Sequence, residues 1–371
     1  MLDKIRGLSV FIITNTLNPG GAEKQAVLLA KQLKQHFATR IIVYYGEKCD
    51  DKLLQLVEQN DIDVIFLNGA HMIKFITLLN LFRNNKSRSI IFSYLAFPNL
   101  INALIGGIAG VNYRIGGIRS SRMSIIKMVI QRFLHNHILT GSVFNNYLGK
   151  EIFTNKGFLP NKSFVIPNCI EIQQDPTSNI KSNDPIIILS VGRFLEVKDY
   201  KTAIYAVGQL KKQLNRSMFT CSLKYLIIGY GNLETQIRNW VYEYGLEHEV
   251  EIVINPPDIA SYYSQADIYL STSLFEGLSN SIMEAMEYSL HVVATNVGDN
   301  KSLIIENETG YLVPVGDYST IASKLFSLIT DNDLMFQMGL KGYYHLKENY
   351  SEEIFKNRYL DLINKIISSK V

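Results

Sequence analysis

The stretch IIILSVGRFLEVKDYKTAIYAVGQLKKQL, residues 186–214, decides the fold. It begins with an apolar run rich in isoleucine, passes through a glycine turn, and continues with apolar residues at helical spacing. A buried strand followed by an amphipathic helix is the repeating unit of a parallel sheet. In such sheets ligands bind in the loops that follow the strands, so SVGRFLEVKD at residues 190–199 is the first place to look for a site.

The same alternation of strand and helix runs through the whole chain. In the first half, the strand-like runs LSVFIIT, TRIIVYY and DVIFL are each followed by a helical pattern. A second series of strands and helices begins after the polar, turn-rich segment at residues 173–185. A chain of 371 residues exceeds what one hydrophobic core usually organises. We therefore expect an α/β protein of two doubly wound domains with a cleft between them.

Charge is distributed unevenly along the chain. Residues 1–172 contain 20 Lys and Arg against 10 Asp and Glu, a net charge of +10, whereas residues 173–371 contain 17 against 24, a net charge of −7. From Val64 to Lys150 there are ten basic residues and no acid. Such a surface attracts anions. The candidates are a phospholipid surface, a pyrophosphate-bearing lipid and nucleic acid. Since no aromatic-plus-basic RNA motif is present, we expect lipid, with an anionic membrane surface as partner, and no nucleic acid.

Residues 120–137, SSRMSIIKMVIQRFLHNH, are amphipathic when wound as a helix. At 100° per residue, Ile126, Val129, Ile130 and Phe133 share one face. Two interpretations are open: this face packs on the sheet of its own domain, or it contacts a membrane. The longest apolar stretch, LAFPNLINALIGGIAGV, is too short and too broken by proline and glycine to span a bilayer.

Cysteine usage and the start of the chain favour a cytoplasmic setting. Cys49, Cys169 and Cys221 lie far apart and form no CxxC pair, so neither a disulfide framework nor a zinc site is indicated. The first apolar run is too short and too strand-like for a signal peptide. Two DxD-like stretches, at 61–63 and 331–333, fit turns or strand starts, and we expect no bound metal.

Two loops contain the principal candidate site residues. Arg193 and Lys198 combine a fork-shaped guanidinium with a point charge, a pair that suits a diphosphate. In FEGLSNSIMEAM, residues 275–286, Glu276 and Glu284 flank a helix start. Ser281 and Glu284 have the spacing of a capping box, which would satisfy backbone donors. Glu276 lies outside that helix, where its carboxylate can accept hydrogen bonds from a polyhydroxylated ligand.

The loop NPGGAEKQ, residues 18–25, follows the first strand. Its two glycines, Gly20 and Gly21, would allow backbone N–H groups to approach a phosphate at the start of the next helix. A plain turn between strand and helix explains them equally well.

Five segments resemble family 4 of the retaining glycosyltransferases in order and spacing. They are GGAE at 20–23, PNCIEI at 167–172, SVGRFLEVKD at 190–199, ADIYLSTSLFEGLSNSIMEAM at 266–286 and ENETGYLVPVGD at 306–317. The resemblance covers nearly the whole chain and is strongest from 186 to 316. The chain departs from the family at Leu290-His291, where a Gly-Pro is common.

The resemblance implies a GT-B architecture of two Rossmann-like domains facing a central cleft. An acceptor-binding domain would span residues 1–172, a linker 173–185 and a nucleotide-sugar domain 186–345, with a helical segment at 346–371 that packs back on the first domain. By family pattern Arg193 and Lys198 grip the diphosphate, Glu276 contacts the donor sugar and Glu284 accepts from the ribose hydroxyls. The other implied donor-binding residues are Gly20, Gly21, Gly192, Leu278, Ser279 and Asn280, and the implied acceptor residues are Asn99 and Arg119.

The implied activity is the transfer of a sugar with retention of anomeric configuration, without metal or cofactor. The donor would be a nucleotide-diphosphate sugar, UDP-linked rather than GDP-linked, and the acceptor an oligosaccharide or lipid-linked saccharide. The setting would be bacterial cell-surface polysaccharide assembly (O-antigen, capsule or a similar glycan) on the inner face of the plasma membrane. Two alternatives share the fold: a nucleotide-sugar epimerase, and a non-catalytic nucleotide-sugar-binding subunit of a membrane complex. A degenerate subunit would be expected to lose Arg193, Lys198 or Glu276, and all three are present.

Overall fold

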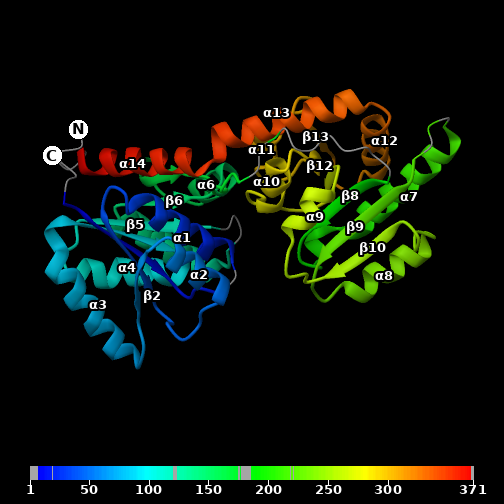
Figure 1. The fold of residues 1–371 in the computed structure, drawn as a ribbon. Coiled ribbons are helices and arrows are strands. Elements are labelled where there is room, and N and C mark those ends of the chain that lie inside the picture. The colour runs from blue at the N-terminus through cyan, green and yellow to red at the C-terminus, as the bar shows by residue number, and fades with distance from the viewer. Residues whose placement is uncertain are drawn as a thin grey trace. The chain divides into compact units, whose positions relative to one another are not determined.

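The computed structural model describes residues 7–18, 20–119, 123–173, 176, 185–217, 219 and 221–368. The chain forms two compact units, one of residues 1–169 with 352–371 and the other of residues 170–351. Each unit contains one parallel sheet with helices packed against it (Figure 1). The predicted α/β class, with two Rossmann-like domains, is confirmed.

The described part of the first unit has a seven-stranded sheet in the order β3-β2-β1-β4-β5-β6-β7. Its strands are β1 (Ser9–Thr14), β2 (Ala38–Val43), β3 (Asp63–Phe66), β4 (Ser89–Tyr94), β5 (Tyr113–Ile118), β6 (Gly141–Phe144) and β7 (Ser163–Val165). Its helices are α1 (Gly21–Leu33), α2 (Asp51–Gln59), α3 (His71–Asn85), α4 (Ala96–Ile108), α5 (Ile125–Phe133), α6 (Tyr147–Asn155) and α14 (Glu352–Ser368).

The central strand β1 is apolar along its length because both faces of the sheet are covered. Val10 and Ile12 point into the core beneath α1 and α14, whereas Phe11 and Ile13 point into a second core with residues of α3 and α4. A strand buried on both faces reads as a continuous hydrophobic run rather than an alternating one. This is why LSVFIIT could be recognised as a strand from sequence.

The described part of the second unit has a six-stranded sheet in the order β10-β9-β8-β11-β12-β13. Its strands are β8 (Ile186–Val191), β9 (Leu223–Gly229), β10 (Val250–Ile254), β11 (Ile268–Ser271), β12 (His291–Thr295) and β13 (Gly310–Val313). Its helices are α7 (Tyr200–Arg216), α8 (Glu234–Glu243), α9 (Ala260–Gln265), α10 (Asn280–Glu287), α11 (Asn300–Leu303), α12 (Tyr318–Ile329) and α13 (Asn332–Tyr350).

The strand order of this second sheet reverses between β8 and β11. In doubly wound sheets the carboxyl ends of the two strands at such a reversal diverge and leave a crevice for ligands. The loops that leave β8 and β11 here are residues 192–199 and 272–279. They contain the two main groups of site residues predicted from sequence.

The C-terminal helix α14 belongs to the first unit, although the chain reaches it from the second. Phe355, Tyr359 and Ile363 of α14 are buried in the core beneath β1, and Lys31 Nζ of α1 lies 3.1 Å from Glu352 Oε2. The chain crosses at 351/352, so α13 stays with the second unit and the returning segment is six residues shorter than expected. The other crossing is at 169/170 rather than 172/173.

His291, at the departure from the family pattern, allows a prediction about pH. The side chain is 1% exposed, its Nε2 has no hydrogen-bond partner in the described chain, and burial lowers its pKa to about 3. The unfolded chain binds a proton near pH 6.5, so the stability from this residue is complete above that pH and is lost as the pH falls toward 3. Urea unfolding should show a loss of stability between pH 7 and pH 5 that is about 2 kcal/mol larger in the native chain than in His291→Asn, which keeps the loss from the buried His135. Equal losses in both proteins would contradict this assignment.

Candidate functional site

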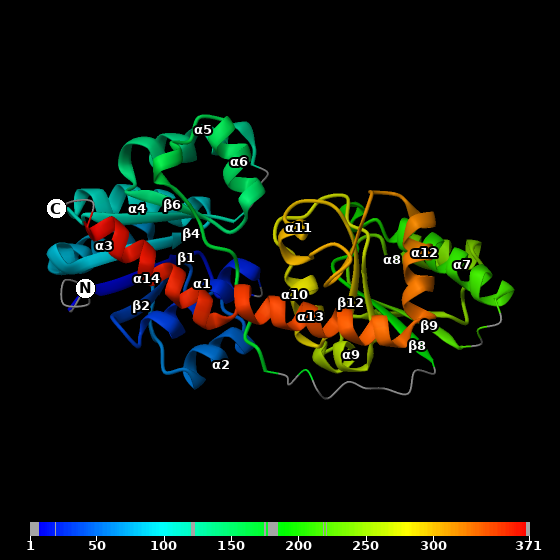
Figure 2. The same cartoon turned by 90° about the horizontal axis from the view of Figure 1, so that it is seen from above.

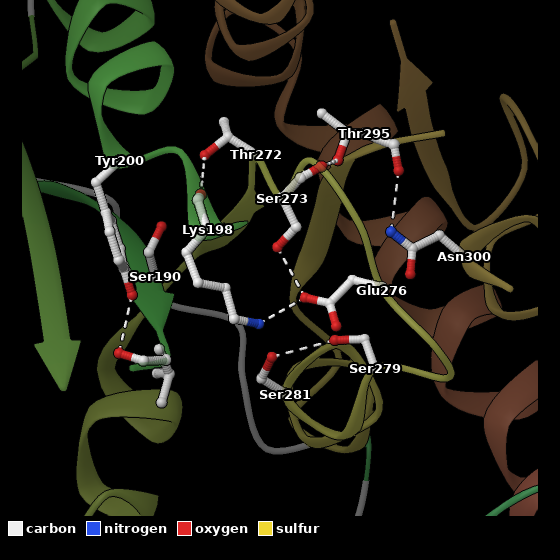
Figure 3. Close-up of polar contacts among 12 residues, drawn as sticks. Ser190, Lys198, Tyr200, Thr272, Ser273, Glu276, Ser279, Ser281, Thr295 and Asn300 are labelled. Carbon is white, nitrogen blue, oxygen red and sulfur yellow. Dashed lines mark hydrogen bonds and ion pairs between the residues drawn. The ribbon is translucent and has the colours of Figure 1, made fainter. Parts of the chain in front are cut away.

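An ion pair joins the two loops at the reversal of the second sheet. Lys198 Nζ lies 2.5 Å from Glu276 Oε1, although 78 positions separate the two residues (Figure 3). Their side chains are 23% and 15% exposed, so the pair is partly desolvated yet still reachable from solvent. The backbones are joined as well, since the N–H of Leu274 donates to the carbonyl of Val197 at 2.8 Å, and Thr272 Oγ1 donates to the carbonyl of Lys198 at 3.0 Å. The loops therefore form one polar site.

Gly192 allows Lys198 to fold back along its own loop. A Cβ at position 192 would lie 3.2 Å from Lys198 Cε and 3.3 Å from the hydroxyl of Tyr200. That hydroxyl donates to the carbonyl of Gly192 at 2.9 Å. A Cβ on Gly229, at the end of the neighbouring strand, would collide with the same carbonyl. Glycine at 192 therefore acts through close packing that directs the ammonium toward Glu276.

A chain of buried hydrogen bonds holds Glu276 from the other side. Ser273 Oγ donates to Glu276 Oε1 at 2.7 Å, and the carbonyl of Ser273 accepts from Thr295 Oγ1 at 2.6 Å. Asn300 Nδ2 donates to the carbonyl of Thr295 at 2.9 Å (Figure 3). Gly298 has φ +58°, and a Cβ there would collide with the carbonyl of Glu276. Because Oε2 of Glu276 has no hydrogen-bond partner among the described residues, it is available to a ligand hydroxyl.

Arg193 is the exposed cation of the site. Its guanidinium makes no hydrogen bond or ion pair with the described residues, in contrast to Lys198. The next residue, Phe194, is fully buried, and its backbone N–H donates to the carbonyl of Tyr230 at 2.7 Å. The backbone beside Arg193 is thus anchored while its long side chain stays in solvent. A diphosphate bound at Lys198 would place its negative charge within reach of the Arg193 guanidinium.

Helix α10 begins beside Glu276 and brings three of the predicted donor-binding residues to the site. Leu278 and Ser279 are buried, and Asn280 is the first helical residue. The backbone N–H groups of a first helical turn have no partner within the helix, so this end can bind a negative or electron-rich group. Contact between a donor and the backbone groups of these residues stays a prediction.

The predicted capping box is wrong. The N-cap of α10 is Ser279, it makes no side-chain cap hydrogen bond, and Ser281 lies inside the helix. Glu284 instead accepts a hydrogen bond at Oε2 from the hydroxyl of Tyr263, at 2.9 Å. Burial, with the nearby carboxylate of Glu284, raises the pKa of Tyr263 well above its usual value, so the phenol stays a donor. Contact between Glu284 and a ribose stays a prediction.

Gly20 and Gly21 lie at the start of α1 in the first unit. Gly20 is the N-cap, and a Cβ there would collide with the carboxylate of Glu23. Glu23 is in the first turn, and its partial burial raises the pKa of its carboxyl group. An internal anion therefore already lies at this helix end. Phosphate binding at Gly20 and Gly21 stays a prediction, and a phosphate there would compete with Glu23.

Asn99 has a structural role. It is 1% exposed, and its Oδ1 accepts from Ser93 Oγ at 2.8 Å and from the N–H of Gly117 at 2.9 Å. Its Nδ2 donates to the carbonyl of Gly117 at 3.0 Å and to Gln131 Oε1 at 2.8 Å. These bonds join β4, β5, α4 and α5. The expectation that Asn99 faces an acceptor is corrected, because its amide is enclosed and fully used within the unit.

Arg119 follows β5, at the carboxyl edge of the first sheet. Its guanidinium stacks 4.0 Å from the ring centre of Tyr94 and donates to Asn168 Oδ1 at 3.2 Å and to the hydroxyl of Tyr359 at 3.3 Å. Because Tyr359 belongs to α14, Arg119 fastens the returning helix to the sheet edge. Contact between Arg119 and an acceptor stays a prediction.

Residues 171–344, which contain the Lys198–Glu276 pair and its supporting network, match the family described as Glycosyl transferases group 1. The chain carries a glycosyl transferases group 1 domain. The reversal of strand order, the cationic loop and the carboxylates at α10 all lie within this glycosyltransferase domain.

Curated relatives of the chain are bacterial glycosyltransferases, several of them named for amylovoran, capsule or lipopolysaccharide biosynthesis. Amylovoran biosynthesis glycosyltransferase AmsK of Erwinia amylovora is 36% identical over 162 residues, 40% of this chain and 38% of that protein. Capsular polysaccharide biosynthesis glycosyltransferase CapH of Staphylococcus aureus is 24% identical, over 80% of this chain and 83% of its own length. The N-acetylgalactosamine-N,N'-diacetylbacillosaminyl-diphospho-undecaprenol 4-alpha-N-acetylgalactosaminyltransferase of Campylobacter jejuni is 25% identical, over 88% and 91%. The match to AmsK thus spans well under half of that relative.

Solved structures resemble the fold over nearly the whole chain. HepE of Anabaena in complex with UDP-glucose superposes with a TM-score of 0.79 at 16% identity, covering 96% of this chain and 100% of that one. TarM of Staphylococcus aureus, in complex with UDP among other ligands, has a TM-score of 0.75 at 13% identity, with coverage of 96% and 100%. The glycosyltransferase domain therefore belongs to a GT-B fold.

Proposed function

We propose that the protein is a retaining glycosyltransferase that moves a sugar from a UDP-sugar to a lipid-linked saccharide during assembly of a bacterial cell-surface polysaccharide. The observation that carries this proposal is the Lys198–Glu276 pair at the reversal of the second sheet, at 2.5 Å. A cation for a diphosphate stands next to a carboxylate for sugar hydroxyls. The UDP-glucose complex of HepE supports the donor, and the undecaprenol acceptor named for the Campylobacter relative supports a lipid-linked acceptor.

In the proposed reaction, the bond between the anomeric carbon of the donor sugar and the diphosphate oxygen breaks, and negative charge develops on the departing UDP. Lys198 exchanges its contact with Glu276 for the diphosphate, and Arg193 approaches from solvent. Preorganised positive charge of this kind is usually the largest contribution to catalysis. These two cations neutralise the leaving group, and we propose that no metal is required. Glu276, released from Lys198 and still held by Ser273 at 2.7 Å, accepts a hydrogen bond from a hydroxyl of the donor sugar.

The activity is tested with the full chain. It is incubated with UDP-glucose, UDP-galactose, UDP-GlcNAc or UDP-GalNAc, and with undecaprenyl-diphosphate-linked saccharides, with and without EDTA. Mass spectrometry detects transfer, and NMR assigns the anomeric configuration of the product. EDTA-insensitive transfer with retention supports the proposal. Isomerised nucleotide sugar without transfer would instead identify an epimerase, and saturable binding without turnover would identify a non-catalytic subunit.

We also propose that the first unit docks on an anionic membrane through α5. The apolar face of this helix is open to solvent, with Ile126 75%, Val129 47% and Phe133 56% exposed. The interpretation that this face packs on the sheet is wrong, because α5 is anchored by other residues. Gln131 Nε2 donates to the carbonyl of Ala96 at 3.0 Å, and Met128 packs on the apolar cluster beneath α6. Figure 2 shows α5 beside α6.

We infer from the charges around α5 which partner binds its apolar face. The acid-free segment from Val64 to Lys150, with its ten cations, includes α5 and the exposed Lys127. Lys74 is buried and Arg119 is bonded within the unit, so the exposed cations such as Lys127 form the basic surface. Anionic lipid complements these exposed cations, and each basic residue near it contributes about 1 kcal/mol at most. In the described part of the chain, no helix is long and apolar enough to cross a membrane. Docking is therefore proposed as peripheral, on the cytoplasmic leaflet.

Vesicle co-sedimentation tests the docking surface. The native chain should sediment with phosphatidylglycerol vesicles at low salt and less at high salt, because the attraction is screened. Ile126→Ser with Phe133→Ser should reduce binding at least tenfold, since each buried apolar side chain contributes about 1.5–3 kcal/mol. Lys127→Gln should weaken it slightly. The other two candidate cations are Arg132, which donates to the carbonyl of Lys156 at 3.0 Å, and Arg122, which lies outside the described residues. Tyr242→Ser, at a position 76% exposed in the second unit, is the control. Equal sedimentation of all variants would exclude this surface.

A further inference from the structure

A pocket opens at the edge of the first sheet that β7 forms. Among the described strands of this sheet, β7 is the last in the order and pairs with β6 alone. The pocket beside it has a volume of about 480 Å³ and is lined by residues of α6, β7 and α14. This volume lies within the range of about 300–1,000 Å³ that is typical of small-molecule sites. We call it the edge pocket.

Three cations from two helices converge on the edge pocket. Lys150 comes from α6, and Arg358 and Lys365 come from α14; the acid in the lining is Asp361. Lys365 Nζ lies 5.5 Å from the ring centre of Phe164, whose side chain forms part of the wall. The lining thus combines three positive charges with one negative charge and an aromatic surface.

Two of these cations lack partners. Within the described residues, neither the ammonium of Lys150 nor the guanidinium of Arg358 makes a hydrogen bond or ion pair, although both side chains are half-buried. Asp361, three residues after Arg358 on the same helix, lies beyond ion-pair distance of it. Three cations held near one another in a concave surface with a single carboxylate raise the local positive potential and attract an anion. An anionic ligand explains this arrangement of cations better than a contribution to folding stability does.

We propose that the edge pocket binds a phosphate group, carried by a soluble phosphate ester or by a lipid head group. A guanidinium presents two parallel N–H donors that match phosphate oxygens, and the ammonium of Lys150 adds a point charge from the opposite helix. Phe164 and Tyr147 provide apolar surface for the group that carries the phosphate. This site is separate from the Lys198–Glu276 pair, which belongs to the other unit.

Binding is measured on the full chain without donor or acceptor. The thermal unfolding midpoint and calorimetric heats are followed against glycerol phosphate at constant ionic strength, and then against dihexanoyl-phosphatidylglycerol below its critical micelle concentration. Ligand at concentration L that binds only the folded state stabilises it by RT ln(1 + L/Kd), so the midpoint rises with ligand concentration, and the heats give the saturation of the site. Arg358→Gln and Lys150→Gln should each weaken binding about tenfold or more, because hydrogen bonds to charged groups are lost. Lys356→Gln, on α14 outside the lining, is the matched control.

The pattern of binding among the variants distinguishes a site for a soluble phosphate ester, a site for a lipid head group and the absence of a site. Saturable binding of glycerol phosphate that is lost in both pocket variants, and kept in Lys356→Gln and Lys198→Ala, supports the site with a soluble ligand. The same pattern with the short-chain lipid alone supports a head-group site. Circular dichroism without ligand checks that each variant is folded, and Arg358→Lys, which keeps the charge but loses the fork, should bind at an intermediate level. Absence of saturable binding, or binding unchanged in both pocket variants, overturns the proposal whether or not sugar transfer is observed.

Discussion

Lys198→Ala is expected to lower kcat/KM for sugar transfer by about 10²–10³-fold, equivalent to about 2.7–4 kcal/mol, by analogy with removing one donor from an oxyanion hole. In the proposed reaction the ammonium stabilises charge that develops on the departing diphosphate, so the loss should fall mainly on kcat. Arg193→Ala should show a loss of the same kind. Because Arg193 is exposed and has no partner in the described chain, that variant should keep the native unfolding temperature.

Steady-state kinetics of purified variants checks this expectation. Lys212→Ala, at an exposed lysine on α7 of the same unit, is the matched control and should behave as the native chain. Lys198→Arg keeps the charge but not the point-like ammonium, and should recover part of the activity. Turnover of Lys198→Ala and Arg193→Ala within a few-fold of the native rate would contradict the diphosphate role.

Glu276→Gln is expected to change the affinities for UDP and for the UDP-sugar in opposite directions. The substitution removes the charge that holds Lys198, at 2.5 Å, so the ammonium is available to UDP at lower cost and UDP should bind more tightly. The charged acceptor for a sugar hydroxyl is lost at the same time. Hydrogen bonds to charged groups contribute about 1.5–3 kcal/mol, so turnover of the UDP-sugar should fall about 10–100-fold or more.

Calorimetric titration with UDP and with the UDP-sugar, combined with turnover, measures this contrast. Glu308→Gln, at an exposed acid in the same unit, is the control and should affect neither ligand. Ser273→Ala removes the second hydrogen bond to Glu276 and should reduce turnover less than Glu276→Gln does. A Glu276→Gln protein that unfolds at a much lower temperature but keeps its specific activity would assign the ion pair to stability.

The strands and their loops could be predicted because the information is local. Runs such as IIILSV carry their β-branched, doubly buried character in consecutive residues, and β8 does end at Val191, just before the loop with Arg193 and Lys198. A parallel sheet then directs attention to the loops after the strands. The candidate cations and both acids therefore came from patterns that span a few residues each.

The contacts that define the site could not be predicted, because they depend on topology. Ser273, Thr295 and Asn300 support Glu276 through hydrogen bonds between the ends of β11 and β12, which are adjacent only once the strand order is known. The one sequence feature that could have pointed to Ser273 and Thr295 as site residues is their position at, or just after, the end of an apolar run. Likewise, Tyr263 lies 21 positions before Glu284, so local spacing suggested a capping box instead.

Helix α5 shows a different limit of sequence patterns. The helical period correctly groups Ile126, Val129 and Phe133 on one side, but it does not tell which side faces the protein. That direction is set by Gln131, which is 4% exposed and bonded to the backbone of Ala96. The prediction that Asn99 faces an acceptor is wrong for a related reason, since a sequence does not distinguish a buried amide from an amide that faces a ligand.

The return of α14 to the first unit has a consequence for how the chain is made. Ribosomes add roughly 5–20 residues per second, so residues 170–351, which are 182 residues, delay the last helix by roughly 10–40 seconds. During that time the nascent first unit lacks Phe355, Tyr359 and Ile363, and the apolar surface that they cover stays open. The part that is translated first is thus completed last. A message that ends early yields a protein with an open core, which chaperones and proteases can distinguish from the finished chain.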